Sequence, residues 1–157
     1  MNSSFTLTKL DSTKIVLKNY KEKIKNMLKI MLEHKELKSS EIFQKNITKI
    51  RFDLSFCNDE TIHQINKEYR NKDCPTDVIT FSLFCDDDNA IIYRKTADLG
   101  QIIISVETAQ KQAKTSLEEE ILTLICHGIL HLFGFDHLTK KDYDFVVRMQ
   151  NQIVGKL

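Results

Sequence analysis

Three of the five histidines in this 157-residue chain lie in one short segment, residues 127–137, which reads His-Gly-Ile-Leu-His-Leu-Phe-Gly-Phe-Asp-His. His127 and His131 stand four positions apart, so on a helix their imidazoles share one face and can bind one ion. Gly134 can adopt the left-handed conformation that ends a helix, and the turn would return His137 toward the other two. The segment therefore predicts three nitrogen ligands around an open coordination position.

Three imidazoles are typical of catalytic zinc sites, although nickel, copper and iron also accept such ligands. Because the ligands are neutral, the ion keeps its full positive charge, which favours hydrolysis and especially hydrolysis of a phosphodiester. The ligand spacing matches that of metzincin-type proteases, but those enzymes carry a glutamate directly after the first histidine, where this chain has Gly128. Peptide hydrolysis is therefore disfavoured.

The helix that carries His127 and His131 is predicted to be buried. Ser116 and Glu119 have the spacing of a capping box, and the residues beyond them are nearly all apolar. Two imidazoles on such a helix need partners, because an unsatisfied buried polar group costs about 1–3 kcal/mol. A shared metal would satisfy both and is favoured over three unrelated core histidines. Cys126 points to another side of the helix and is assigned to the core.

The composition, 41% hydrophobic and 29% charged, suits one globular domain spanning residues 1–157. The apolar patterns predict an α+β fold, with a mixed sheet of about four strands flanked by about five helices and a metal site at the end of a buried helix. The expected strands lie within 5–17, at 49–56, at 78–83 and, in the centre of the sheet, at 101–105, with an acidic loop at 86–89 and a continuing hairpin at 91–93.

Helices are expected at about 18–37, from Asn58 until Pro75 ends the helical region, at about 106–114, at 116–133 and after Thr139. Tyr69 is assigned to the buried side of the second of these helices, and Tyr143 to that of the last.

The charge of the chain is nearly balanced, since 23 basic residues accompany 22 acidic ones. A nucleic-acid partner would therefore have to be held by a local basic patch. A lysine row on the first helix could face RNA or merely solvent; it consists of Lys18, Lys21, Lys25 and Lys29.

Arg70 is the second candidate for a basic group that contacts nucleic acid, because it directly precedes an ordered turn expected at residues 71–76. With Lys67 and Lys72 beside it, its guanidinium is suited to bidentate contact with a phosphate. A salt bridge to a nearby carboxylate, Asp73 or Asp77, is the alternative role.

Two carboxylates are placed to assist the histidines. Asp77 could orient a ligand histidine, act as a base or cap the turn, of which the structural role is favoured. Asp136, next to His137, is a candidate hydrogen-bond partner for a ligand.

The chain is expected to be cytosolic. Its first residues lack the basic start and apolar run of a secretory signal, and no apolar stretch approaches the roughly 18 residues of a membrane span. The four cysteines form no Cys-x-x-Cys pair and are expected to be free thiols; they are Cys57, Cys74, Cys85 and Cys126.

The histidine segment, the stretch 66–78 (Asn-Lys-Glu-Tyr-Arg-Asn-Lys-Asp-Cys-Pro-Thr-Asp-Val) and Leu99-Gly100-Gln101-Ile102 together resemble the YbeY family of bacterial ribosomal-RNA maturation factors. The likeness extends from about residue 48 to the C-terminus. It implies a metal-dependent, single-strand-specific endoribonuclease of α+β fold that acts in 16S rRNA 3′-end maturation and in ribosome quality control.

The resemblance also implies particular roles for residues and partners. By the resemblance His127, His131 and His137 would bind one zinc ion, and Arg70 would be the functionally important arginine of the groove. His131 and Arg70 are expected to take part in catalysis, and the residues beside Arg70 add the expectation that Lys67 and Lys72 contact the substrate with it. The implied partners are single-stranded or ribosomal RNA and the ribosome or its small-subunit proteins, with no membrane. Either water or the RNA's own 2′-hydroxyl would attack phosphorus.

The chain departs from the usual pattern of the family at four positions. Gln101 stands where Asp is usual after Leu-Gly, so a charge-dependent role of that position is in doubt. Thr80 and Ser82 replace Ser and Pro, and Phe135 replaces a common Tyr. None of these is a proposed metal ligand.

Two other functions compete with the nuclease. One is a ribosome-associated RNA-binding assembly factor in which the metal is mainly structural, which the missing glutamate and the balanced charge favour. The other is a metal hydrolase acting on peptides or small molecules.

Overall fold

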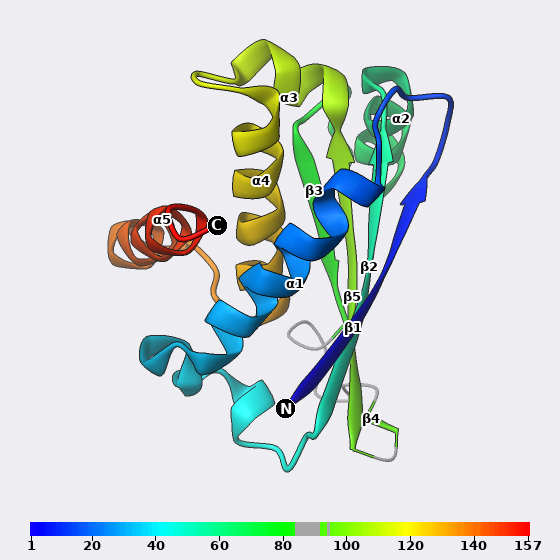
Figure 1. Cartoon of the computed structure of the whole chain (residues 1–157). Coiled ribbons are helices and arrows are strands. Elements are labelled where there is room, and N and C mark those ends of the chain that lie inside the picture. Colours follow the sequence, from blue (N-terminus) through cyan, green and yellow to red (C-terminus); the bar gives the residue numbers. More distant parts are fainter. Residues whose placement is uncertain (84–91, 94) are drawn as a thin grey trace.

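The computed structural model describes residues 1–83, 92–93 and 95–157. Its centre is a mixed five-stranded sheet in the order β1-β2-β5-β3, with β4 also pairing with β5 (Figure 1). The strands are β1 (Asn2–Lys9), β2 (Lys49–Cys57), β3 (Val78–Ser82), β4 (Ile92–Tyr93) and β5 (Thr96–Ser105). β1, β2 and β5 are parallel, whereas β3 and β4 run antiparallel to β5. The predicted α+β fold with a mixed sheet is confirmed.

Five α-helices and two short 3-10 helices accompany the sheet in the described part of the chain. They are α1 (Lys18–Glu33), η1 (Lys35–Ser39), η2 (Glu41–Phe43), α2 (Asp59–Arg70), α3 (Val106–Gln112), α4 (Leu117–Leu132) and α5 (Lys140–Val154). Figure 1 shows α1 and α4 across one side of the sheet, with α5 beyond α4 and α2 on the other side.

The sheet separates two apolar layers. The larger one joins α1, α4 and α5 to the sheet and includes Phe52, Leu54 and Ile102. The smaller one lies under α2 and consists of Cys57, Ile62, Ile79 and Ile103, with Ile65 and Phe81 packed against it. Because side chains alternate along a strand, neighbouring residues of β3 and β5 face different layers. This alternation decides which residues of β3 face the histidines of α4.

The predicted centre of the sheet and the predicted helix starts are confirmed. β5 lies between β2 and β3. Asn58 accepts a hydrogen bond from the Thr61 amide, and Ser116 one from the Glu119 amide. Thr139 and Asp142 form a reciprocal capping box at the start of α5. These caps satisfy amides that the first turn of a helix leaves without partners.

The first strand and first helix end earlier than expected. Residues 15–17 belong to no strand; the chain bends after β1, where the Asp11 carboxylate accepts the Thr13 amide at 2.8 Å. α1 stops at Glu33, and η1 replaces its expected last turn. The expected acidic loop at 86–89 and Ile91 lie outside the described residues, whereas residues 92–93 form β4.

The assignment of Tyr69 and Tyr143 to buried positions is wrong. Their side chains are 65% and 55% exposed. The apolar layer under α2 reaches only to Ile65 and Phe81, so the last turn of that helix has little to pack against. On α5 the buried positions begin one turn later, at Val146. Both rings thus stand at the margins of the core.

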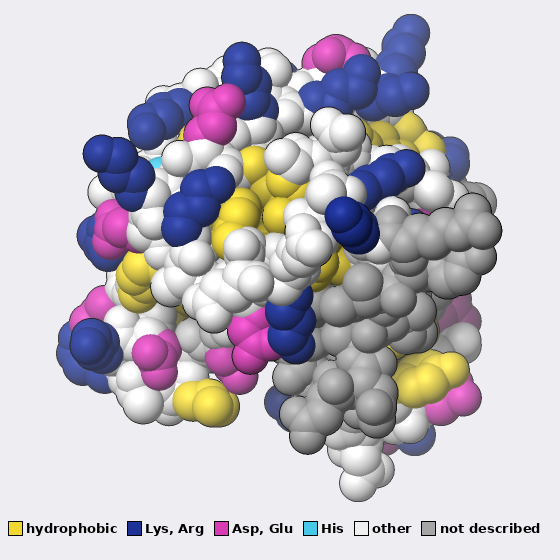
Figure 2. Space-filling view, turned by 90° about the horizontal axis from the view of Figure 1, so that it is seen from below, with side chains coloured by type: hydrophobic (Ala, Val, Ile, Leu, Met, Phe, Trp, Pro, Cys, Tyr) yellow, Lys and Arg dark blue, Asp and Glu magenta, His cyan; other side chains and the backbone are white. Residues whose placement is uncertain are grey.

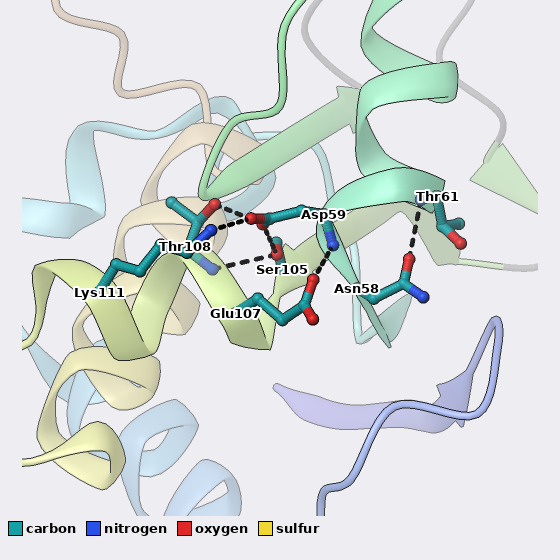
Figure 3. A network of polar contacts seen from close by, with 7 residues as sticks. All are labelled: Asn58, Asp59, Thr61, Ser105, Glu107, Thr108 and Lys111. Atoms are coloured by element: carbon teal, nitrogen blue, oxygen red, sulfur yellow. Dashed lines mark hydrogen bonds and ion pairs between the residues drawn. The ribbon is translucent and has the colours of Figure 1, made fainter.

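A polar network joins the starts of α2 and α3 (Figure 3). One Asp59 oxygen accepts hydrogen bonds from the Ser105 and Thr108 hydroxyls, each at 2.6 Å, and the other accepts from Lys111 at 2.5 Å. Burial raises the pKa of Asp59, but these hydrogen bonds outweigh it and bring the pKa to about 2, from an ordinary value of 3.8.

Replacing Asp59 with asparagine is expected to lower the free energy of unfolding by about 1–2 kcal/mol at pH 7. Because the pKa is depressed in the folded state, the contribution is complete above the unfolded pKa of 3.8 and disappears as the pH falls toward 2. Urea unfolding of D59N and wild type at a series of pH values across this range measures the stabilising contribution of Asp59. The exposed Lys140–Asp144 pair provides the control, since D144N should change stability little at any pH. A D59N deficit that is independent of pH would contradict the assignment.

Candidate metal centre and its cavity

The C-terminal end of α4 turns sharply at Gly134. This glycine has φ 91°, in the left-handed region, as the sequence predicts. Its amide donates to the His131 carbonyl at 2.9 Å, and the Phe135 amide donates to the Leu130 carbonyl at 3.0 Å. These two hydrogen bonds form a Schellman motif, which satisfies the last carbonyls of the helix and reverses the chain.

The turn brings the three histidines of the segment together. One nitrogen from each of His127, His131 and His137 lies within 4.8 Å of the others. The Nε2 atoms of His127 and His131 are 2.9 Å apart. The cluster is partly buried, with His137 the most exposed of the three. The predicted convergence of the histidines is therefore confirmed.

Neighbouring acceptors orient the two helix-borne imidazoles. His127 Nδ1 lies 3.2 Å from Oε1 of Gln150 on α5, and His131 Nδ1 lies 3.8 Å from an Asp136 carboxylate oxygen. Gln150 lies within hydrogen-bonding distance of His127, the Asp136 carboxylate lies near His131, and Nε2 of each ring faces the other ring. These two nitrogens and one nitrogen of His137 form a compact set of imidazole donors, which fits a metal ion.

Protonation states also suit a metal. Burial lowers the pKa of His127, and burial together with the other two histidines lowers the pKa of His131 to about 4. Both rings are thus neutral at physiological pH, which is the form that binds metals. The sequence reasoning missed Gln150, although it stands on the buried stripe of α5 beside Met149 and Ile153, where a polar residue calls for a partner.

Arg70 and the histidines open onto one cavity of about 410 Å³. The walls come from the end of α2, one face of β3, the end of α4 and the turn after it. They consist of Arg70, Asp77, Val78, Thr80, Ser82, His127, His131, Gly134, Asp136 and His137. A cationic side chain and a candidate metal cluster from distant parts of the sequence therefore face the same space.

Arg70 makes no ion pair within the part of the chain that the structure describes. Asp73, one of its two expected alternatives, accepts from His63 at 2.7 Å and from Lys67 at 3.2 Å instead. Lys67 and Lys72 do not line the cavity. The guanidinium is thus available to an anion in the cavity, whereas the two lysines lie outside it.

The turn that follows Arg70 is fixed by two asparagines. Asn71 takes the left-handed conformation, φ 55°, and ends α2 four residues before Pro75, which had been expected to end it. Asn66 is 1% exposed and donates from its side chain to the Cys74 carbonyl at 2.8 Å. The ordered turn predicted at 71–76 is present directly after Arg70, which lines the cavity.

Asp77 is held by the protein around it. One carboxylate oxygen accepts from the Val78 amide at 2.8 Å and from the Thr76 hydroxyl at 3.2 Å, and the other accepts from Gln112 at 2.9 Å. These contacts match the favoured structural role, in which Asp77 caps the turn before β3. Asp136 accepts a hydrogen bond from the His137 amide at 2.7 Å and so helps to fix the backbone at a candidate ligand.

Gly128 allows α4 to approach β5 closely. A Cβ built on this residue would lie 2.8 Å from two carbons of Ile102, which is closer than packed carbon atoms allow. The glutamate that proteases carry at this position therefore has no room here. The steric constraint supports the prediction from sequence that peptide hydrolysis is disfavoured.

Replacing Gly128 with alanine is expected to lower the free energy of unfolding by about 1–2 kcal/mol, because overpacking outweighs the better helix propensity of alanine. Chemical denaturation checks this. Thr123→Ala, on the same helix at a partly exposed position, should be neutral or slightly stabilising. A Gly128→Ala protein as stable as Thr123→Ala would show that α4 and β5 are not in tight contact.

Three of the four departures from the family pattern lie on the sheet and divide between its two faces, whereas Phe135 packs against the larger core from the turn after α4. Thr80 and Ser82 line the cavity. Gln101 follows Gly100 on β5 and faces the α2 side, opposite to Ile102, and it donates to the Ser55 hydroxyl at 3.2 Å. The Gln101 side-chain amide therefore links β5 to the neighbouring strand β2 and does not line the cavity.

Other candidate groups lie away from the cavity. The lysine row is exposed along α1, where Lys25 also pairs with Glu22. Figure 2 shows one end of the molecule, with basic and acidic side chains both present around its outline.

Cys57, Cys74 and Cys126 are free, and Cys126 is fully buried as predicted. Burial raises the pKa of Cys126 to about 12, so it does not compete for metal.

Comparisons with known proteins show which family the chain belongs to. The profile of the family described as Endoribonuclease YbeY matches residues 6–157. An Endoribonuclease YbeY of Bacillus pumilus is 36% identical over 152 residues, 92% of this chain and 90% of the relative. One of Prochlorococcus marinus is 37% identical over 113 residues, which are 70% of this chain and 60% of the relative.

A solved structure shares the fold. The solution structure of TM1509 from Thermotoga maritima matches with a TM-score of 0.56 at 22% identity, covering 98% of this chain and 91% of the other. Among the described residues, no helix has the length and apolar character needed to cross a membrane.

Proposed function

The chain belongs to the YbeY family of endoribonucleases, and from this premise we propose that it is a zinc-dependent endoribonuclease that cleaves single-stranded RNA. Its cytoplasmic role is maturation of the 16S rRNA 3′ end and ribosome quality control, with the ribosome or its small-subunit proteins as partners. One observation carries the proposal: Arg70 and the three histidines line the same cavity.

In this proposal one metal ion is bound by three ligands, His127, His131 and His137. Three imidazoles in a partly buried cluster favour zinc over the hard, oxygen-seeking cations. A bound zinc ion supplies Lewis-acid stabilisation of the phosphodiester as negative charge develops on it. The second-layer contacts from Gln150 and Asp136 keep the ligand nitrogens pointed inward.

Arg70, which lines the same cavity as the histidines, binds the phosphate in this proposal. Its planar fork can contact two phosphate oxygens at once, and the cavity gives it no competing carboxylate partner in the described chain. Thr80 lines the same cavity, and its hydroxyl can hydrogen-bond to the ribose or phosphate. Lys67 and Lys72, outside the cavity, contact the flanking RNA backbone.

The cleavage step breaks the bond between phosphorus and the leaving oxygen of the next nucleotide. If the 2′-hydroxyl attacks, it loses its proton and the products end in a 2′,3′-cyclic phosphate and a 5′-hydroxyl. If water attacks, no cyclic phosphate forms. The two routes are separated by analysis of the product ends.

The purified protein is expected to cleave single-stranded RNA and to leave peptides, DNA and fully paired RNA intact. The cavity has a phosphate-binding arginine, and the close contact of Gly128 with Ile102 leaves no place for the protease glutamate. Parallel assays on a panel of these substrates measure this preference, with product ends identified by mass spectrometry. Preferential turnover of peptides or non-RNA phosphodiesters would overturn the proposal.

A second function is favoured by one observation. Among the residues that the structure describes, no glutamate lines the cavity, and the two carboxylates that do, Asp77 and Asp136, accept hydrogen bonds from backbone amides. An assembly factor that binds ribosomal RNA and uses its metal for stability would need no general base. In that case metal removal lowers the melting temperature, and Arg70→Glu weakens ribosome association without unfolding the protein, while RNA cleavage stays negligible throughout.

A further inference from the structure

Tyr143 stands beside the metal cluster with its ring largely free. It lies in the first turn of α5, and its ring centroid is 6.4 Å from that of His137, at an interplanar angle of 75°. Its side chain is 55% exposed. Among the described residues its hydroxyl has no hydrogen-bond partner, so neither the core nor a polar network accounts for its position.

Local helix structure does not account for it either. Leu138 and Tyr143 occupy the two positions, before the cap and in the first turn, at which apolar residues often pack together as a hydrophobic staple. A staple buries both side chains, yet Leu138 is 86% exposed. The Thr139–Asp142 capping box already fixes the start of α5. The helix start is therefore secured without the two apolar side chains, which remain open to solvent.

The surroundings of Tyr143 identify what could cover it. His137 lines the cavity, and Arg70 lines it from another wall. A phosphate held between Arg70 and the histidines would place an adjoining nucleotide on the His137 side, where the exposed ring stands. An aromatic face stacks on any nucleobase, but only on a base that is not already paired and stacked within a duplex.

We propose that Tyr143, with Leu138 at its margin, is a stacking platform for one unpaired base of the RNA next to the cleavage site. This inference rests on the proposed function and extends it, because it assigns the preference for single strands to a particular side chain. An aromatic ring can stack on any of the four bases, so the platform selects single-stranded over paired RNA and does not discriminate between sequences. Tyr143 is a binding residue in this scheme and moves no proton.

The test measures binding of a fluorescein-labelled single-stranded oligoribonucleotide by anisotropy, with intact RNA verified on gels. Tyr143→Ala should weaken binding by about 5- to 150-fold, the range found for loss of one stacked base. Tyr143→Phe should stay within twofold of wild type. An oligonucleotide without bases should bind wild type and Tyr143→Ala equally, because it offers nothing to stack.

Tyr69→Ala is the matched control. Tyr69 is also an exposed tyrosine set edge-on to another ring, 5.5 Å from Phe81 at 73°, but Phe81 belongs to the α2 side of the sheet. It should bind RNA as wild type does. The inference is overturned if Tyr143→Ala binds normally, if Tyr143→Phe is as weak as Tyr143→Ala, or if Tyr69→Ala is equally weak.

Failure of the proposed function gives a different result. In that case wild type itself neither binds nor cleaves the single strand, and the variants have nothing to lose. Wild-type binding and cleavage that Tyr143→Ala leaves unchanged would remove only the stacking platform. Thermal melting of each variant verifies folding, and the exposure of both tyrosines predicts changes of no more than a few degrees.

Discussion

Replacing His131 with alanine is expected to abolish metal binding and to reduce RNA cleavage by about 1,000-fold or more. The variant removes one of three ligands, and the lost stabilisation of transition-state charge amounts to several kcal/mol. Metal analysis of the purified protein and a single-turnover cleavage assay check the two effects together. Both metal content and the cleavage rate should fall, and a higher RNA concentration should restore neither of them.

Stability separates a lost ligand from a misfolded protein. Without metal, His131→Ala should stay folded and close to wild type in stability, because His131 is only partly buried and lines the cavity. With zinc, only wild type should gain stability, as expected when a ligand binds the folded state alone. His63→Ala is the control, since His63 pairs with Asp73 outside the cavity and should keep full metal content and activity. Cleavage that survives both chelation and His131→Ala would refute a metal-centred mechanism.

Replacing Arg70 with alanine is expected to lower kcat/KM for single-stranded RNA by about 100- to 1,000-fold, comparable to removal of one donor to a developing anion. Arg70→Lys should recover part of the loss, because lysine keeps the charge but cannot bind two oxygens in one plane. Steady-state and single-turnover kinetics at fixed ionic strength measure both variants.

Metal content and melting temperature should not change in the Arg70 variants, since Arg70 is exposed and has no ion pair among the described residues. Arg51→Ala provides a matched control, because Arg51 pairs with Asp98 on the sheet, away from the metal cavity. Full activity of Arg70→Ala would exclude the arginine from substrate binding. Activity lost only in parallel with unfolding would assign it to the fold.

Local rules were sufficient to predict the metal cluster. The spacing of His127 and His131, the glycine two residues beyond the helix and the apolar helix itself are all features of one continuous segment. The turn at Gly134 has the conformation that its residue type favours. The caps at Asn58, Ser116 and Thr139 followed for the same reason, since a cap depends on residues within a few positions of it.

What the sequence could not supply depends on distant packing. The opening of Arg70 onto the histidine cavity requires α2 and α4 to lie on opposite faces of the sheet and β3 to bring their ends together. Tyr69 and Tyr143 match the apolar periodicity of their helices, yet the core ends before it reaches them. Periodicity identifies the face of a helix but not how far the core beneath it extends.

The most direct test of the metal-centred mechanism is cleavage activity measured against metal occupancy. The protein is freed of metal by chelation and titrated with zinc, and the rate of cleavage of one single-stranded RNA is recorded at each bound zinc-to-protein ratio. We predict that activity is absent at the start, rises in proportion to bound zinc and saturates at about one ion per chain. Full activity of the metal-free protein would contradict the mechanism.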